Sequence, residues 1–359
     1  MGELTFLKEL YPLYEDAVKK ARVRMDNLIK PLGSLGTLEE MAIRLSGITG
    51  KLHNEVNKKA IVIMCSDNGV CEEGVASAPQ IVTLTQTINF LRGITGVAVL
   101  SKHNRCDLKV VDIGVKEDIT ISGLITKKIR KGTWNSAKGE AMTREEALKA
   151  IHIGFDLVRE LKEEGYNLIG TGEMGIGNTT TSSSVLLALT GCSIDEGVGR
   201  GAGLKDEQFF HKKEVIKKIL QVNKPVKEDP IDVLHKVGGF DIAGMVGLYL
   251  GAAYYRIPIV VDGFISAVAA LAAYKINPLT KDFMFPSHIS KEKGYNRAIN
   301  EIGLDPILNL GMRLGEGSGC PLAFNIIEAA TVIMNNMATF EEGDVDIENY
   351  KDLWKEEAK

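Results

Sequence analysis

Four short apolar runs, each ending in a polar or glycine-rich turn, constrain the fold of this 359-residue chain most strongly. They are rich in β-branched residues, are separated by stretches with helical spacing, and span residues 60–65, 108–114, 166–170 and 258–263. A run that is apolar on both faces fits a parallel strand, because helices cover both faces of a parallel sheet. We therefore expect an α/β fold, in which a mostly parallel sheet has helices on both faces.

An acidic residue lies at or near the end of each of these runs. Asp67, Asp112, Glu173 and Asp262 occupy the four positions. Ligands of open α/β sheets bind beyond the carboxyl ends of the strands. Four acids at equivalent positions therefore favour a functional site at this edge, although any one of them could instead cap the N-terminus of a helix.

The segment GTGEMGIGNTTTSSSVLLALTG, residues 170–191, follows the third run and opens a helix. Its glycines permit tight turns, and its Thr and Ser residues offer hydroxyls and backbone N–H groups at a helix N-terminus, which attracts anions. We predict phosphate binding here; the alternative is a plain strand-to-helix turn with Ser and Thr caps. A GxGxxG pattern also occurs, but Glu173 would repel a pyrophosphate and the helix is expected to begin near Thr179, which weakens a dinucleotide interpretation.

A lone acid among glycines marks a second candidate site. Glu316 lies in MRLGEGSGCPLAF, residues 312–324, between Gly315 and Gly317. A tight and mainly apolar loop disfavours the charged form of a carboxyl group, so the pKa of Glu316 should rise toward the range of a general base. The alternative is an exposed Glu in a glycine turn, and the spacing alone does not decide between the two.

Three further segments carry weaker signals. Residues 66–96 contain a strand-end turn and an amphipathic helix with Gln86, most of which could be core. Residues 237–271 place glycines at helical spacing, which predicts a tight contact between a helix and its neighbour. His288 and Ser290 of FPSHIS could bind a ligand, although a lone His is more often structural.

Length and capping patterns indicate the organisation of the chain. Its 359 residues correspond to about two domains. Thr37 with Glu40, and Thr143 with Glu146, form two capping-box patterns that predict helix starts. The first of these places helical structure ahead of the first strand.

The composition argues against several classes of protein. Lys and Arg number 43 against 47 Asp and Glu, and this net charge of −4 argues against nucleic-acid binding. The five Cys form no CxxC pair and the six His show no HxH or HExxH spacing, which argues against a disulfide framework or a metal site. No signal-peptide pattern is present, and the uncharged apolar stretches 242–255 and 263–274 are too short to span a bilayer. We therefore expect a soluble, cytoplasmic protein.

Seven motifs occur in order over nearly the whole chain, from about residue 22 to residue 345. They are KPLGSLGTLEE, SDNGV…EGV, GTGEMGIGNTTTSS, VGRGAGL, VGGFDIAGM, VDGFISAVAA and RLGEGSG. In these motifs the chain closely resembles the nicotinate-nucleotide–dimethylbenzimidazole phosphoribosyltransferase family, which serves in assembly of the lower ligand of cobalamin. The resemblance implies transfer of phosphoribose from nicotinate mononucleotide to 5,6-dimethylbenzimidazole or a related base, giving nicotinate and α-ribazole 5′-phosphate.

The same resemblance implies how the molecule is organised. It predicts a Rossmann-like sheet in a large α/β domain, residues 51–304, and a small helical domain built from residues 1–50 and 305–345. Residues 346–359 would form a charged tail. It also implies a homodimer that acts on small-molecule substrates and uses no metal or cofactor.

The resemblance assigns roles to residues by motif. Glu316 would be the catalytic base, Glu173 a second active-site carboxylate, and Gln86 part of the benzimidazole pocket. Ala78 stands where a Ser before Pro is expected, which removes a hydroxyl contact and leaves the base preference open. The other substrate contacts would come from the wall that holds the nucleotide and from loops near it: Gly175, Ile176, Gly177, Asn178, Thr179, Gly201, Ala202, Gly203, Asp262, Ser290, Leu314 and Gly315.

Two rival functions use the same segments. A nucleotide-dependent oxidoreductase would rely on the GxGxxG match, and a non-enzymatic sensor of phosphorylated metabolites would bind its ligand without releasing nicotinate. In the transferase interpretation, one ring nitrogen of the benzimidazole attacks C1′ of the ribose while Glu316 removes the proton from the other nitrogen. No metal is needed for that step, because no diphosphate leaves.

Overall fold

A computed structural model describes residues 4–345 of the chain. Its centre is a six-stranded sheet in which every pairing is parallel, in the order β3-β2-β1-β4-β5-β6. The strands are β1 (Lys59–Ser66), β2 (Asp107–Gly114), β3 (Leu124–Thr126), β4 (Leu168–Met174), β5 (Ile259–Val261) and β6 (Met284–Pro286). The strand order reverses between β1 and β4, as in a Rossmann fold, and such a switch point is where ligands bind.

The four apolar runs form β1, β2, β4 and β5, which confirms the predicted α/β fold. All residues of β1 and β4 are buried, and the apolar run of β1, residues 60–65, follows from helices on both faces. The two edge strands, β3 and β6, were not predicted. Each has three residues, β3 is partly exposed, and β6 ends in Pro286, whose missing N–H is tolerated at a sheet edge.

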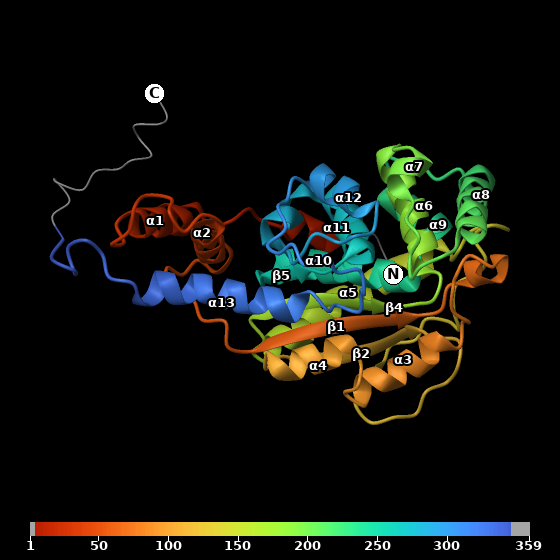
Figure 1. The fold of residues 1–359 in the computed structure, drawn as a ribbon, viewed down its shortest axis with the longest axis horizontal. Coiled ribbons are helices and arrows are strands. Elements are labelled where there is room, and N and C mark those ends of the chain that lie inside the picture. Colours follow the sequence, from red (N-terminus) through yellow and green to blue (C-terminus); the bar gives the residue numbers. More distant parts are fainter. Residues whose placement is uncertain (1–3, 346–359) are drawn as a thin grey trace.

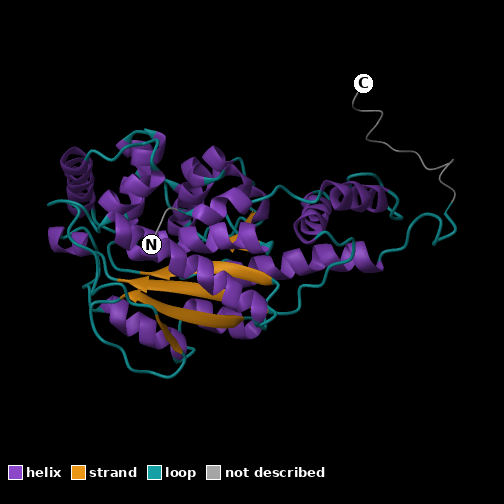
Figure 2. Ribbon diagram, turned by 180° about the vertical axis from the view of Figure 1, so that it is seen from behind, coloured by secondary structure: helices purple, strands orange, loops and turns teal. Residues whose placement is uncertain are grey.

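Helices cover both faces of this sheet (Figures 1 and 2). One face carries α10 (Phe240–Tyr255) and α11 (Phe264–Ile276), with α5 (Arg144–Glu163) packed on α10; the other carries α3 (Val82–Leu91), α4 (Gly96–His103) and α13 (Cys320–Asn336). The remaining helical elements are η1 (Thr5–Glu9), α1 (Glu15–Asp26), α2 (Thr37–Thr49), η2 (Gly69–Glu73), α6 (Asn178–Thr190), α7 (Ile194–Gly197), α8 (Asp206–Asn223), α9 (Pro230–Val237), η3 (Pro278–Phe283) and α12 (Tyr295–Ile302).

Two helices touch through their backbones. A Cβ atom added at Gly247 of α10 would lie 2.0 Å from the carbonyl oxygen of Ile151 in α5, and one at Gly154 would lie 2.0 Å from that of Gly244. Only glycine fits such an approach. The tight contact predicted from the glycine spacing is therefore confirmed, and it fixes the position of α10 over the sheet.

Helices from the two ends of the chain lie together at one end of the molecule (Figure 1). The Arg24 Nε of α1 donates to the Met334 carbonyl oxygen, 2.9 Å away, near the end of α13, where helix carbonyls lack intrahelical partners. The start of α13 packs instead on β4 and β5. The division into residues 51–304 and 1–50 with 305–345 stays a prediction, and the expected tail, 346–359, lies outside the described residues.

One capping-box prediction is confirmed and the other is wrong. The Thr143 hydroxyl accepts from the Glu146 N–H at 3.1 Å, and the Glu146 carboxylate accepts from the Thr143 N–H at 2.9 Å. Thr37 is already the first residue of α2, and Gly36 occupies the cap position without a side chain to offer. The Glu39 carboxylate accepts instead from the Leu35 N–H, at 2.9 Å.

Residues 4–345 include no helix that is both long and apolar enough to cross a bilayer. The same residues contain no group of three or more His, Cys, Asp or Glu side chains placed to hold a metal ion. All five cysteines are free thiols.

Candidate active site

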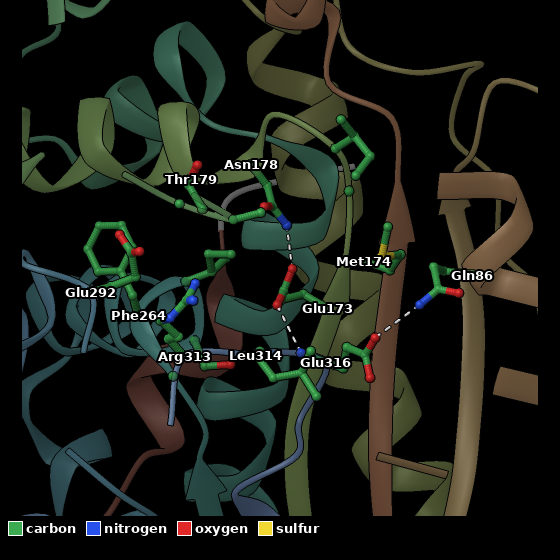
Figure 3. Close-up of a pocket in the computed structure, with 18 of the residues that line it drawn as sticks. Gln86, Glu173, Met174, Asn178, Thr179, Phe264, Glu292, Arg313, Leu314 and Glu316 are labelled. Carbon is green, nitrogen blue, oxygen red and sulfur yellow. Dashed lines mark hydrogen bonds between the residues drawn. The ribbon is translucent and has the colours of Figure 1, made fainter. Parts of the chain in front are cut away.

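A cavity of about 290 Å³ lies beyond the carboxyl ends of the central strands. Its wall combines the end of β4, the start of α6, the first turn of α11, one side of α3 and the loop of residues 313–316, as Figure 3 shows in part. These segments are far apart in the sequence and meet only because the sheet brings them together. The cavity therefore occupies the place where a parallel α/β sheet binds its ligand.

Glu316 projects from a turn with an unusual backbone. Its φ is +64°, and those of Gly315 and Gly317 are +80° and +93°, in the left-handed region that residues with a Cβ rarely adopt. The carboxylate is 7% exposed and accepts from the Gln86 Nε2 at 3.2 Å and from the Val97 N–H at 3.4 Å. Burial raises the pKa of Glu316, as expected for a carboxyl group in this kind of loop.

Glu173, at the end of β4, is a second buried carboxylate beside the first. One of its oxygens accepts from the Glu316 N–H at 3.3 Å, and the other accepts from the Asn178 side-chain amide (Figure 3). Burial, together with the nearby negative charge of Asp241, raises the pKa of Glu173 to about 8. The free protein therefore holds Glu173 largely protonated near neutral pH.

Asn178 bridges Glu173 to a third acid that the sequence analysis missed. Its Nδ2 also donates to the Asp241 Oδ2, 3.1 Å away, in the first turn of α10. Asp241 has no exposed surface, and burial raises its pKa to about 6. The available signal was the presence of one acid in an otherwise apolar helix, α10, where the sequence analysis considered the glycine spacing.

Gln86 is held between the Glu316 carboxylate and two polar residues of its own helix. The Asn89 Nδ2 donates to the Gln86 Oε1 at 3.0 Å, and the Arg92 Nη1 donates to the Asn89 Oδ1 at 3.3 Å. Residues three apart share one face of a helix, so Gln86, Asn89 and Arg92 form a line from Glu316 to the surface at the end of α3. Successive hydrogen bonds of this kind polarise one another, which favours the orientation in which Gln86 donates to Glu316.

The opposite end of the cavity is built from backbone. Helix α6 begins after Gly177, whose φ is +92°, and no side chain caps its first turn. The Ile176 N–H is held by the Thr83 hydroxyl at 3.0 Å, which fixes the loop before the helix. Gly201 and Ala202 line the cavity together with the first residues of this helix. An uncapped helix N-terminus next to a glycine loop suits an anion such as phosphate.

Lys212 brings a positive charge to this end from behind. It has no exposed surface, and its Nζ donates to the Thr179 hydroxyl at 2.9 Å and to the Gly199 carbonyl oxygen at 3.2 Å. Burial lowers its pKa to about 8. The sequence analysis missed it, although Lys212 falls on the same face of α8 as the buried Ile216 and Ile219. A lysine on the apolar face of a helix was the available signal.

Arg313 and Glu292, which the sequence analysis also missed, add a cation and an anion to the wall. Arg313 lines both the central cavity and an outer one of about 570 Å³. Burial raises the pKa of Glu292, while the charge of Lys212 lowers it. Arg313 lies in the candidate segment 312–324, where only the acid was singled out, and Glu292 lies two residues beyond FPSHIS.

Most of the residues expected at the site line one continuous space. Those around the central cavity are Gln86, Glu173, Gly175, Ile176, Asn178, Thr179, Gly201, Ala202, Ser290, Leu314, Gly315 and Glu316. Gly177 lines an adjoining cavity of about 90 Å³, and Gly203 lines the outer one. Asp262 lies behind the wall, where its oxygens accept from the Gly317 and Gly319 N–H groups. Asp262 is not among the residues that line the cavity, and its contact with substrate stays a prediction.

The GxGxxG pattern serves packing in this structure. Gly170 and Gly172 lie inside β4, not in a turn after it. A Cβ at Gly170 would lie 2.7 Å from that of Cys320, and one at Gly172 would lie 2.4 Å from the Glu316 carbonyl oxygen. These glycines make room for the loop that carries Glu316 and for α13, so the arrangement differs from a dinucleotide fingerprint.

Comparisons with known proteins agree with this architecture. The family model described as phosphoribosyltransferase matches residues 10–345. A Clostridium perfringens protein named nicotinate-nucleotide–dimethylbenzimidazole phosphoribosyltransferase is 56% identical over 98% of this chain and 97% of its own length. A protein of the same name from Ruminiclostridium cellulolyticum is 57% identical over 94% of this chain and 96% of its own. The crystal structure of CobT from Thermus thermophilus has a TM-score of 0.88 at 37% identity and covers 92% of this chain and 99% of that one.

The Rossmann-like sheet, with an acid-lined cavity at its switch point, defines an α/β enzyme of the phosphoribosyltransferase class. Within that class, the chain belongs to the nicotinate-nucleotide–dimethylbenzimidazole phosphoribosyltransferase family. The family predicted from the seven motifs is confirmed.

Proposed function

We propose that this enzyme transfers phosphoribose from nicotinate mononucleotide to 5,6-dimethylbenzimidazole or a related base, in assembly of the cobalamin lower ligand. The products would be nicotinate and α-ribazole 5′-phosphate. One observation carries the proposal beyond family membership: a buried carboxylate, Glu316, and an uncapped helix N-terminus at Asn178 face the same cavity. A proton acceptor and an anion holder are the two elements that this reaction requires.

The acidic end of the cavity supports the chemical step. One benzimidazole nitrogen forms a bond to C1′, the bond from C1′ to the pyridinium nitrogen breaks, and its electron pair leaves with nicotinate. The second ring nitrogen becomes acidic as positive charge builds on the base, and the Glu316 carboxylate takes its proton. A positioned base of this kind contributes roughly 10²–10⁴-fold in rate. The raised pKa of Glu316 matches that role.

Glu173 lines the cavity next to Glu316, so in the proposed complex it would face the positive charge that develops on the sugar. A cationic pyridinium ring beside its carboxyl group would lower its pKa and favour the ionised form. The ionised carboxylate would then stabilise developing charge at C1′. Asn178, which donates to Glu173, would hold the carboxylate in place as that charge develops.

The backbone end of the cavity supports binding of the nucleotide. The first turn of α6, the Gly201–Ala202 turn and the Arg313 guanidinium surround a space that suits the 5′-phosphate. The Lys212 Nζ donates to the Thr179 hydroxyl and so places a positive charge next to this space. Holding the phosphate would keep the nucleotide in the cavity with C1′ toward the acidic end, and a contact that is the same before and during the reaction contributes to binding of the nucleotide.

The test is to incubate the protein with nicotinate mononucleotide and 5,6-dimethylbenzimidazole and to measure both products by chromatography. Stoichiometric release of nicotinate and formation of α-ribazole 5′-phosphate are expected. Ligand binding without nicotinate release would favour a metabolite sensor instead. Reduction of NAD by a hydride donor would favour an oxidoreductase. A parallel series with benzimidazole, adenine and a phenol would define the preferred acceptor.

We also propose that the enzyme is a homodimer, as its family resemblance implies. Apolar side chains are exposed at the end of the molecule where the terminal helices meet, including Val23 at 63% and Val332 at 50%, which supports a covered face there. Light scattering of the full chain should give twice the 39.1 kDa mass of one chain. A mass of one chain across the micromolar range would contradict this.

A further inference from the structure

The loop that carries Glu316 lies in a conformation that requires support from outside the loop. Three consecutive residues, Gly315, Glu316 and Gly317, have positive φ, and only the middle one has a Cβ atom. Such a backbone persists only where its surroundings hold it. The bonds within the loop, from the Ser318 N–H to the Gly315 carbonyl and from the Cys320 N–H to the Gly317 carbonyl, close turns but do not fix the loop relative to the sheet.

We propose that Asp262 is a positioning residue that aims the catalytic base, through two hydrogen bonds from the backbone of the Glu316 loop to its carboxylate. The Gly317 N–H donates to its Oδ2 at 3.0 Å, and the Gly319 N–H donates to its Oδ1 at 2.7 Å. The two donors lie on the C-terminal side of Glu316. This inference rests on the proposed function, because it assigns Asp262 a part in that reaction.

The place of Asp262 in the fold suits this task. It follows β5 directly, so the sheet sets its position, and it is 1% exposed. Burial raises the pKa of Asp262 to about 7, and the Gly319 and Gly317 N–H groups act against this shift. A buried carboxyl group with a backbone donor on each oxygen is a rigid attachment point. Its side chain does not line the cavity, so Asp262 affects the reaction through the Glu316 loop and through its charge, which helps to raise the pKa of Glu173.

The loop is confined from the strand side as well. A Cβ at Gly317 would lie 3.1 Å from the Gly172 Cα, and a Cβ at Gly172 would lie 2.4 Å from the Glu316 carbonyl oxygen. Glu173 holds the remaining side by accepting from the Glu316 N–H at 3.3 Å. The loop thus cannot move toward β4, and loss of Asp262 would leave it free to move only away from the sheet.

A merely structural role makes a different prediction, since Gly319 also begins α13 and Asp262 could serve only to anchor that helix. Loss of an anchor lowers the fraction of active protein by the same factor whatever residue stands at position 316. Loss of a positioning contact lowers kcat only while the Glu316 carboxylate is present to be positioned. The two roles are therefore separated by a double-mutant cycle.

The experiment measures kcat and KM for full-length wild type, Asp262→Asn, Glu316→Gln and the double variant, normalised to nucleotide-binding sites counted by calorimetry. We expect Asp262→Asn to lower kcat about 10–100-fold, because an ångström of misplacement can have such an effect, with KM for the nucleotide nearly unchanged. In the Glu316→Gln background the same substitution should change kcat less than about threefold. An equal loss in both backgrounds overturns the proposal.

The matched control is Tyr249→Phe. Tyr249 is fully buried, and its hydroxyl pairs with the Thr171 hydroxyl at 2.9 Å and donates to the Ser266 carbonyl at 3.1 Å, so its removal perturbs the same core without touching the loop. Its kcat should stay within about twofold of wild type. Wild-type release of nicotinate decides the proposed function separately, because that measurement involves no variant.

A second measurement needs no substitution and holds even if Asp262→Asn does not fold. Hydrogen exchange on the wild-type protein should show the amides of Gly317 and Gly319 exchanging at least about 100-fold more slowly than in an unfolded chain. Exchange of both amides at unfolded-chain rates would overturn the proposal, since the two bonds would then be absent in solution.

Discussion

The two ends of the cavity are built in opposite ways. At the acidic end, Glu173 and Glu316 are buried side chains whose pKa values are raised because water is excluded. At the phosphate end, the groups are mostly backbone of α6 and of the glycine loop, with Lys212 behind them. The acidic end has groups that can accept or release a proton, and the other end has N–H groups that can donate hydrogen bonds. Changes at the acidic end should therefore alter kcat, and changes at the phosphate end should alter KM for the nucleotide.

The largest effect is expected from Glu316→Gln. The amide keeps the shape and can still meet Gln86, but it cannot accept the proton, so kcat should fall by about 100-fold or more. Steady-state product release measures this, and circular dichroism checks that the fold survives. Turnover near that of wild type would reject Glu316 as the base. The acidic end would then no longer differ from the other end in its effect on kcat.

The next effect is expected from Lys212→Met at the phosphate end. Methionine fills a similar volume without the charge, so the fold should survive the change of a buried cation. Loss of a bond to a charged group is about 1.5–3 kcal/mol, so KM for nicotinate mononucleotide should rise about 10–100-fold with kcat little changed. Lys217→Met, on the exposed side of the same helix, is the control. A fall in kcat at constant KM would contradict the expectation that this end of the cavity acts on binding of the nucleotide.

The pH dependence of stability should reveal the protonated carboxyl group at the acidic end. Glu173 has a pKa near 4.3 when unfolded and about 8 when folded, so between these values the folded state binds more protons. Glu173 therefore contributes fully to the free energy of unfolding below about pH 4.3, and this contribution is lost as the pH rises through 8. Urea denaturation of wild type minus Glu173→Gln should show this decline. The exposed Glu145→Gln should not, and a flat difference for Glu173→Gln would contradict the assignment.

The smallest effect is expected from Ala78→Ser at the rim of both inner cavities. A restored hydroxyl can form one neutral hydrogen bond, so KM for the aromatic base should change by about 2–10-fold while KM for the nucleotide stays constant. Ser77→Ala, one residue away, is the control. If KM for the nucleotide changed and KM for the base did not, Ala78 would belong to the phosphate end.

The fold was predictable because its signal is local. Strands buried on both faces carry long apolar runs, and the run 60–65 forms most of β1 while Leu168 and Ile169 begin β4. The edge strands β3 and β6 were missed because three residues carry no periodicity, and β3 is partly exposed while β6 ends in proline. The equally short β5 was found because Ile-Val-Val is followed directly by the turn signal Asp262-Gly263. The capping box at Thr37 failed for a related reason: the pattern does not say whether Thr37 stands before the helix or inside it.

Site residues could be predicted from the sequence only where a charged residue stood in a segment of small or apolar residues. Glu316 stood out as an acid among glycines, and its burial confirms the expected environment. Asn178 and Asp241 meet through α6 and α10, which no local pattern brings together. Asp262 was recognised as an acid at a strand end, but sequence could not show that the backbone of a distant loop would occupy its oxygens.

Helix α13 has a mechanical consequence for the enzyme. Its 17 residues form a rod of about 26 Å, which begins directly after the Glu316 loop and ends among α1 and α2 (Figure 1). A tilt of about 5° along such a rod moves one end by about 2 Å relative to the other. A shift of the outer helices would therefore move the loop that carries Glu316.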